Sequence, residues 1–154
     1  MTFRLKKPKE PTMLLDGGVC VEVTLPPAEL SPNGRHHWRR VREAVQSYRN
    51  LCHWKAIQVR NEWRGTPMPW PRAEVQLFWY HPVLRNRDAD NATASAKAAM
   101  DALKRAGIIA DDRILDEQDP VAIGIITRLP RIAIDRERPR LEIWVRPLRE
   151  GGEG

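Results

Sequence analysis

The chain has 154 residues, a length that suits a single domain. A hydrophobic content of 42% with 6 tryptophans is enough for a packed core and excludes wholesale disorder. The 2 cysteines are too few for a disulfide scaffold and form no CxxC pair, and no apolar run approaches the roughly 20 residues of a membrane span. The first residues lack the apolar stretch of a secretion signal, so we expect a soluble protein of the reducing cytoplasm.

The net charge of +6 and the pI near 9.8 favour a nucleic-acid partner. The charge is unevenly distributed: residues 1–77 carry 13 Lys and Arg against 7 Asp and Glu, whereas residues 78–154 carry 13 of each. The stretch 88–119 holds 8 acids and 4 bases, so a locally negative segment lies inside a basic protein. Clustered carboxylates do not help a protein to bind phosphate. These acids therefore either lie on a different face or hold a cation.

The spacing of apolar residues predicts the elements of the first half. Residues 1–18 are expected to form a flexible basic arm. Alternation over 19–25 predicts a strand with one buried face, which Pro26 and Pro27 end. After a loop over 28–34, helical spacing predicts a long helix over 38–63 that packs on a sheet. Its expected buried stripe is Trp38, Val41, Val45, Tyr48, Cys52, Ala56, Val59 and Trp63.

The second half predicts a strand, a helix and further strands. Residues 65–71 cannot continue a helix, and a strand is predicted over 73–80. A polar loop then leads to a helix predicted over 92–106, with Gly107 at its C-cap. The remaining predicted strands cover 121–129, 132–134 and 141–145, followed by a disordered tail over 147–154.

This order of strand, helix, strand, helix and then two or three strands predicts a small α/β (α+β) domain over residues 19–146. We expect a mixed sheet with two main helices packed against it.

Two aspartates precede the second predicted helix. Asp88 and Asp90 are two residues apart, so in an extended segment their side chains point to the same side. Asp90 or Asn91 also suits the N-cap of the helix. One capping aspartate with a solvated neighbour is therefore the alternative interpretation.

The pair Asp111 and Asp112 follows the helix and is ordinarily turn chemistry. A short helix could nevertheless return the chain so that Asp88, Asp90 and one of this pair converge. Carboxylates at close range repel one another, and a divalent cation such as Mg²⁺ removes that cost. Lys97 lies seven residues after Asp90, within about 20° of the same helix face, where it could hold a phosphate. An exposed helical lysine is the alternative interpretation.

These residues, in this order, resemble the RusA-type Holliday-junction resolvases, a family of crossover-junction endodeoxyribonucleases. DADN at 88–91 and KAAMDALKRAGIIADD at 97–112 are similar to the family's D-x-D-N, K-x-x-x-D-x-L and A-G-[apolar]-x-x-D-D signature. LSPNGRHHW at 30–38 is similar to the loop after the family's first strand, and LEIWV at 141–145 to its closing strand. In some members the lysine follows the second aspartate by four residues instead of seven, which shifts it by about 4.5 Å along the same helix face.

The resemblance, which spans about residues 19–146, implies a Mg²⁺-dependent endonuclease with Mn²⁺ as a substitute metal. It implies that Asp88, Asp90 and Asp112 bind the metal and activate water, with Asp111 as an alternate ligand to Asp112. Lys97 would stabilise charge on the phosphate or the leaving group.

The resemblance further implies a homodimer that cuts opposing strands of a four-way DNA junction and is encoded by a bacterium or a phage. Asp101 matches a family aspartate and is interpreted as structural or as supporting the site. The implied DNA-contacting residues are Asn33, Arg35, Arg39, Arg40 and Arg87.

Two other functions fit the same residues. One is a non-catalytic DNA-binding protein that assists recombination, in which the acids cap helices and the arginines bind DNA. The other is a metal-dependent nuclease for other branched or flapped substrates. The four histidines show no zinc-like spacing, and both cysteines are interpreted as core residues rather than nucleophiles.

Overall fold

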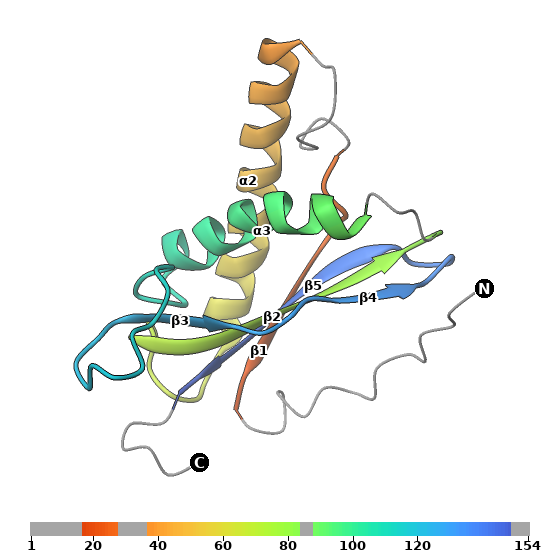
Figure 1. The fold of residues 1–154 in the computed structure, drawn as a ribbon. Coiled ribbons are helices and arrows are strands. Elements are labelled where there is room, and N and C mark those ends of the chain that lie inside the picture. The colour runs from red at the N-terminus through yellow and green to blue at the C-terminus, as the bar shows by residue number, and fades with distance from the viewer. Residues whose placement is uncertain (1–16, 28–36, 84–87, 149–154) are drawn as a thin grey trace.

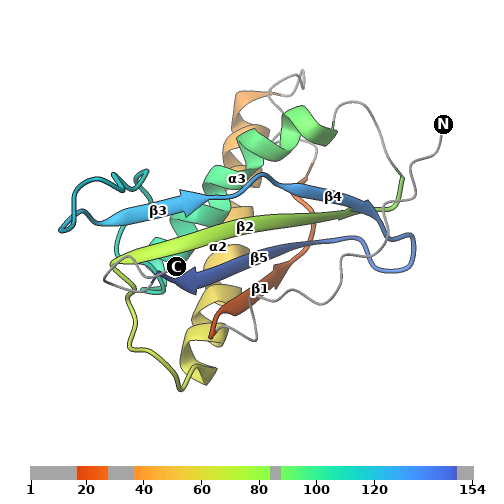
Figure 2. The same cartoon turned by 60° about the horizontal axis from the view of Figure 1, so that its bottom comes forward.

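A computed structural model describes residues 17–27, 37–83 and 88–148, with the backbone alone described at 88–95. Both helices cover the same face of one sheet (Figures 1 and 2). The predicted small α/β domain with a mixed sheet and two helices is therefore confirmed. In chain order the elements are β1 (Val19–Val23), α2 (Trp38–Glu62), β2 (Arg72–His81), α3 (Asp88–Arg105), β3 (Gly124–Thr127), β4 (Arg131–Ile134) and β5 (Arg140–Pro147).

The sheet has the order β1-β5-β2-β3, and β4 pairs with β2 as well. Strand β5 runs antiparallel to both β1 and β2. Strands β3 and β4 run parallel to β2 and follow one another along the same edge of it. Pro130 stands between them and has no N–H for the ladder, which accounts for the interruption. The short strand predicted around Ile132 is therefore real, and the chain ends in three strands.

The main core lies between the sheet and the helices. Alternate residues of β1, β2 and β5 face α2 and α3, as the period of a half-buried strand requires. From α2 the core receives Tyr48, Cys52 and Ala56. The Tyr48 hydroxyl also donates a hydrogen bond to the carbonyl of Thr24, 3.0 Å away, which ties α2 to the end of β1.

Three sequence predictions need correction. Trp38 was expected in the buried stripe of α2, but it is 61% exposed because the first turns of this 25-residue helix extend beyond the sheet. The strand predicted over 121–129 begins only at Gly124, since Asp119 Oδ1 accepts the N–H of Val121 and Pro120 forms a turn there. The second helix begins at Asp88, four residues earlier than predicted.

The opposite face of the sheet carries a second, smaller cluster. Phe78, Tyr80, Ala133 and Trp144 are buried there, and the rings of Phe78 and Trp144 meet edge to face at 5.9 Å. The guanidinium of Arg140 lies 3.9 Å from the centre of the Tyr80 ring. Charged side chains thus share this face with aromatic ones.

Glu74 is the most enclosed carboxylate on this face, with only 4% of the residue exposed. Its two oxygens accept hydrogen bonds from Arg128 Nε at 2.8 Å and from Arg146 Nη2 at 2.7 Å. Burial opposes ionisation, but the two guanidiniums outweigh it and lower the pKa of Glu74 below its ordinary value. Glu74 thus joins the loop after β3 to β5 across β2.

Glu74→Gln is expected to lower the free energy of unfolding at pH 7 by about 2 kcal/mol, because charge-assisted hydrogen bonds lose their anionic acceptor. The folded-state pKa lies below the ordinary 4.5. The contribution of the carboxylate is therefore complete above about pH 4.5 and is lost as the pH falls through the folded-state value. Urea unfolding at pH 7 and pH 3 should show the gap between variant and wild type shrinking in acid.

Glu137→Gln, at an exposed residue, serves as the control. It should change the free energy of unfolding by less than about 0.5 kcal/mol. A gap for Glu74→Gln that stays constant between the two pH values would contradict the ion-pair account.

Candidate functional site

The candidate site is organised by α3, which runs antiparallel to β2. Helix α3 starts a few residues after β2 ends, and the chain after α3 returns to the start of β2 (Figure 1). The backbone N–H of Trp70 donates to the carbonyl of Ile108 at 2.8 Å, and that of Ala110 donates to Trp70 at 2.9 Å. Gly107 makes this return possible, since its φ of +78° is one that glycine adopts without strain.

The segment after α3 places Asp111 and Asp112 beside the last turn of the helix. Lys104 Nζ lies 3.4 Å from Asp111 Oδ1 and 3.8 Å from Asp112 Oδ1. Arg113 donates two hydrogen bonds to Asp111 Oδ2, from Nε at 2.9 Å and from Nη2 at 2.7 Å. The hydrogen bond from Arg113, opposed by slight desolvation and reinforced by Lys104, holds the pKa of Asp111 well below its ordinary range.

The two aspartates therefore differ in what they can still bind. Both oxygens of Asp111 are engaged by cations, and its side chain is 18% exposed. Asp112 has the longer contact to Lys104, and its side chain is 29% exposed. Of the alternatives that the sequence left open, Asp112 is the carboxylate better able to accept a further ligand.

Asp88 and Asp90 lie at the other end of the same helix. The extended backbone expected for them is wrong, because α3 already begins at Asp88. The argument that alternation in a strand turns both side chains to one side therefore does not apply. Their side chains are outside the described residues, so only their positions at the start of α3 are given.

The expected convergence of three carboxylates within one chain is also wrong. Lys104, which contacts Asp112, lies fourteen positions after Asp90 in the helix. At about 1.5 Å per residue this is about 21 Å along the axis. A bound Mg²⁺ needs its ligand oxygens at about 2 Å. The helix is too long, and too straight in Figure 1, for its two ends to share one ion.

Lys97 lies exposed between the two ends of α3. It lies seven positions after Asp90 and seven before Lys104. At about 100° per residue the three positions therefore fall within about 40° of one another around the helix axis. Asp101 is used differently, since its Oδ2 accepts from Arg49 Nη2 of α2 at 3.2 Å. This ion pair joins the two helices, which is a structural contact.

The residues expected to contact DNA are only partly described. Arg39 and Arg40 are exposed in the first turn of α2, where no acidic residue is present. Asn33, Arg35 and Arg87 lie outside the described residues. The expected N-terminal arm, apart from residues 17 and 18, lies outside them too. The tail expected over 147–154 begins too early, because Pro147 ends β5 and the N–H of Leu148 donates to the carbonyl of Arg72 at 2.9 Å; residues 149–154 lie outside the described residues.

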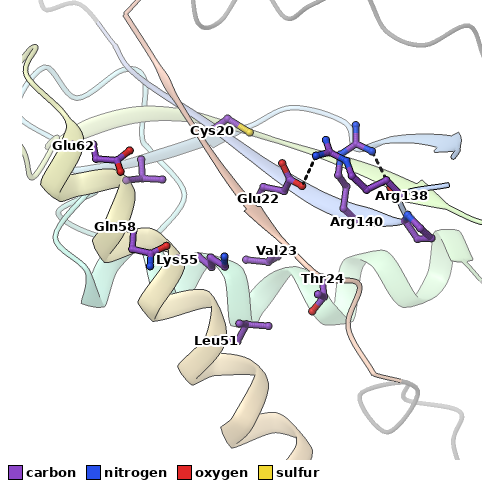
Figure 3. Close-up of a pocket in the computed structure, with 12 residues that line it drawn as sticks. Cys20, Glu22, Val23, Thr24, Leu51, Lys55, Gln58, Glu62, Arg138 and Arg140 are labelled. Carbon is purple, nitrogen blue, oxygen red and sulfur yellow. Dashed lines mark hydrogen bonds and ion pairs between the residues drawn. The ribbon is translucent and has the colours of Figure 1, made fainter.

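Sequence reasoning missed a pocket of about 540 Å³ between β1, α2 and the residues that lead into β5 (Figure 3). Charges of both signs line it, from Glu22, Glu62, Lys55 and Arg138, and Arg138 pairs with Glu22 at 3.4 Å. Cys20 also lines it, but burial and nearby carboxylates raise the pKa of this thiol to about 12, so it is a poor nucleophile. None of the predicted catalytic residues contributes to this pocket.

Comparison with family models and with curated proteins gave no match for this chain. Within residues 17–27, 37–83 and 96–148, no three His, Cys, Asp or Glu side chains gather as a metal site would require. Neither described helix is long and apolar enough to cross a membrane.

Gly124→Ala tests how the segment around Asp112 is held. A Cβ at this position would lie 2.6 Å from the carbonyl oxygen of Arg113 and 3.0 Å from the backbone of Leu115. That segment is bonded to β3 through Ile125 N–H to Arg113 O at 2.8 Å. We expect the variant to lose about 1–3 kcal/mol of unfolding free energy in urea titrations, because the backbone must move. Thr127→Ala in the same strand should cost under about 1 kcal/mol, and equal stabilities of Gly124→Ala and wild type would contradict the close approach.

Proposed function

We propose that this protein is a Mg²⁺-dependent, structure-specific endodeoxyribonuclease that resolves four-way DNA junctions. The observation that carries the proposal is the ordered set Asp88, Asp90, Lys97 and Asp112, all borne by α3 or by the turn directly after it. This set lies in a basic chain whose net charge of +6 suits a DNA partner. The function places the protein with DNA in the cytoplasm of a bacterium or of a phage-infected cell.

The chemistry of the described residues fits a hard cation in part. Mg²⁺ takes oxygen ligands and retains waters, and Asp112 offers an accessible carboxylate. Asp111 fits less well, because arginine and lysine already occupy its oxygens. A bound metal would acidify a water and polarise the scissile phosphate. Lys104 would hold Asp112 in place, and Lys97 would stabilise negative charge on the phosphate.

The length of α3 supports a site built from two copies of the chain. Because Asp112 contacts Lys104, which lies about 21 Å along the helix axis from Asp90, the missing carboxylates would come from another copy. In a two-fold dimer with the α3 helices antiparallel, the start of each helix would lie beside the Asp112 of its partner copy. Such a dimer has two equal sites, as paired nicks on opposing strands require.

DNA contacts would come from the basic first turns of α2. Arg39 and Arg40 are exposed there, and the positive end of the helix dipole adds to their charge. Binding through such phosphate contacts should weaken steeply with salt. Mn²⁺ is expected to replace Mg²⁺, since both accept carboxylate and water ligands.

One observation favours the alternative, a DNA-binding protein that assists recombination without cutting. Lys104 and Arg113 already neutralise the Asp111–Asp112 pair, so no metal is needed to relieve repulsion between these two carboxylates. The alternative predicts salt-sensitive junction binding with no metal-dependent nicking.

Asp112→Asn separates the two functions. The nuclease proposal predicts that wild type nicks a synthetic four-way junction with Mg²⁺ or Mn²⁺, and that the variant loses at least about 100-fold in rate. Its junction affinity, measured with Ca²⁺ in place of Mg²⁺, should stay within about twofold, because Asp112 is not a phosphate contact. Denaturing gels of end-labelled junctions give the rate.

Asp116→Asn is the matched control, an exposed aspartate four residues further along the same segment, and should cleave like wild type. Unimpaired nicking by Asp112→Asn would overturn the assigned site. Junction binding by a wild-type protein that never nicks would favour the alternative.

A further inference from the structure

The first turns of α2 project from the domain beyond the level at which α3 crosses it (Figure 1). The buried residues of this helix are Tyr48, Cys52 and Ala56, and none of residues 38–47 is buried. The core therefore holds the later turns of the helix, while seven of its first ten residues are exposed to solvent.

Trp38 opens this projecting part and is 61% exposed. Its indole stacks on His37, with ring centres 5.7 Å apart and planes 28° apart. The Arg39 guanidinium lies 5.3 Å from the centre of the same ring. His37 is held in turn, since its side chain accepts the backbone N–H of Arg39 at 3.3 Å. A large aromatic surface is thus presented to solvent among planar polar groups.

The side chains around Trp38 are positively charged, whereas the first turn of a helix is stabilised by negative charge. Arg39, Arg40 and Arg42 follow within four residues, against one exposed acid, Glu43, and the first turn has no acidic residue. Cations near a helix N-terminus are unfavourable by a few tenths of a kcal/mol each, so this arrangement does not serve the stability of the helix. It does create a strongly positive surface around an exposed indole, which suits a polyanion that carries aromatic bases.

The exposed indole also lies on the side of α2 where α3 packs. Counting about 100° per residue, Arg42 lies about 40° and Arg49 about 20° from Trp38 around the helix. Arg49 forms its ion pair with Asp101 of α3, which fixes the direction of this side. Trp38 and Arg42 therefore face the space on the α3 side of the projecting helix.

We propose that Trp38 is a branch-recognition residue, whose indole stacks on a base pair exposed at the centre of an opened four-way junction. This inference rests on the proposed function. In a continuous duplex each base pair is covered on both faces by its neighbours. At an opened branch point, one face of each flanking base pair has lost its neighbour and can accept an aromatic side chain. The adjacent arginines would bind the phosphates of the same strands.

The experiment compares junction and duplex binding without cleavage. Affinities are measured in EDTA for a four-way junction and for a linear duplex of the same sequence closed by hairpins at both ends. Trp38→Ala should weaken junction binding by roughly fivefold or more, which is the lower end of the range for the loss of one base–aromatic stack. It should weaken duplex binding by less than about twofold. Trp38→Phe should restore most of the junction affinity.

Trp54→Ala is the matched control, because Trp54 lies on the same helix and is 65% exposed, and its ring neighbour is His53, with ring centres 6.5 Å apart. It should leave the ratio of junction to duplex affinity unchanged. Both variants should retain the wild-type melting temperature, since neither indole is buried.

Three results would overturn the inference: equal losses on junction and duplex, no loss on either, or conversion of a dimer to a monomer by Trp38→Ala in sedimentation. The last would assign the indole to an interface between copies. Because no metal is present, the outcome is independent of nicking. A selective loss for Trp38→Ala in a protein that never cuts would refute the nuclease and keep the branch-recognition role.

Discussion

The structure depends on the way in which α3 is laid antiparallel to β2 and fixed at its far end. Trp70 exchanges backbone hydrogen bonds with Ile108 and Ala110, so the chain leaving the helix must return to the start of β2. The Arg49–Asp101 ion pair then fixes the helix against α2. Helix α3 therefore holds two acidic elements a fixed distance apart, with Asp88 and Asp90 at its start and the Asp111–Asp112 pair beside its last turn.

The length of α3 changes how the acidic residues at 88–90 and 111–112 are interpreted. Read along the chain, the carboxylates of 88–90 and 111–112 suggest a single cluster. In the fold they lie at opposite ends of α3. Under the proposed function each would be half of a site, and a dimer with antiparallel α3 helices would complete that site twice. The oligomeric state is then part of the chemistry, since neither copy would hold all the ligands.

The elements that sequence reasoning predicted well are those whose periodicity comes from burial. Strand β2 and strand β5 were predicted within two residues at each end, because their alternate side chains face the helical core. The same reasoning failed at Trp38, where helical spacing continues beyond the point at which the sheet ends. It also placed the start of α3 too late, because Asp88 and Asp90 are as acceptable in a first helical turn as in a cap.

The sequence allowed the residues of the candidate site to be predicted, but not their positions relative to one another in space. Sequence order brought Asp88, Lys97 and Asp112 together, yet the direction in which α3 returns depends on the pairing of Trp70 with Ile108. The engagement of Asp111 by Arg113 likewise depends on a turn that no spacing rule specifies. The charged pocket beside β1 was missed because its lining comes from segments far apart in the chain.

Subunit mixing tests most directly the claim that the active site is shared between copies. Asp90→Asn and Asp112→Asn, each expected to be inactive alone, are mixed, allowed to exchange subunits and assayed with Mg²⁺ on a four-way junction. In a mixed dimer one site receives Asp90 from one variant and Asp112 from the other, so it is intact. The account predicts that nicking returns and is confined to one strand per junction. Mixed dimers, isolated by two affinity tags, that stay inactive would contradict it.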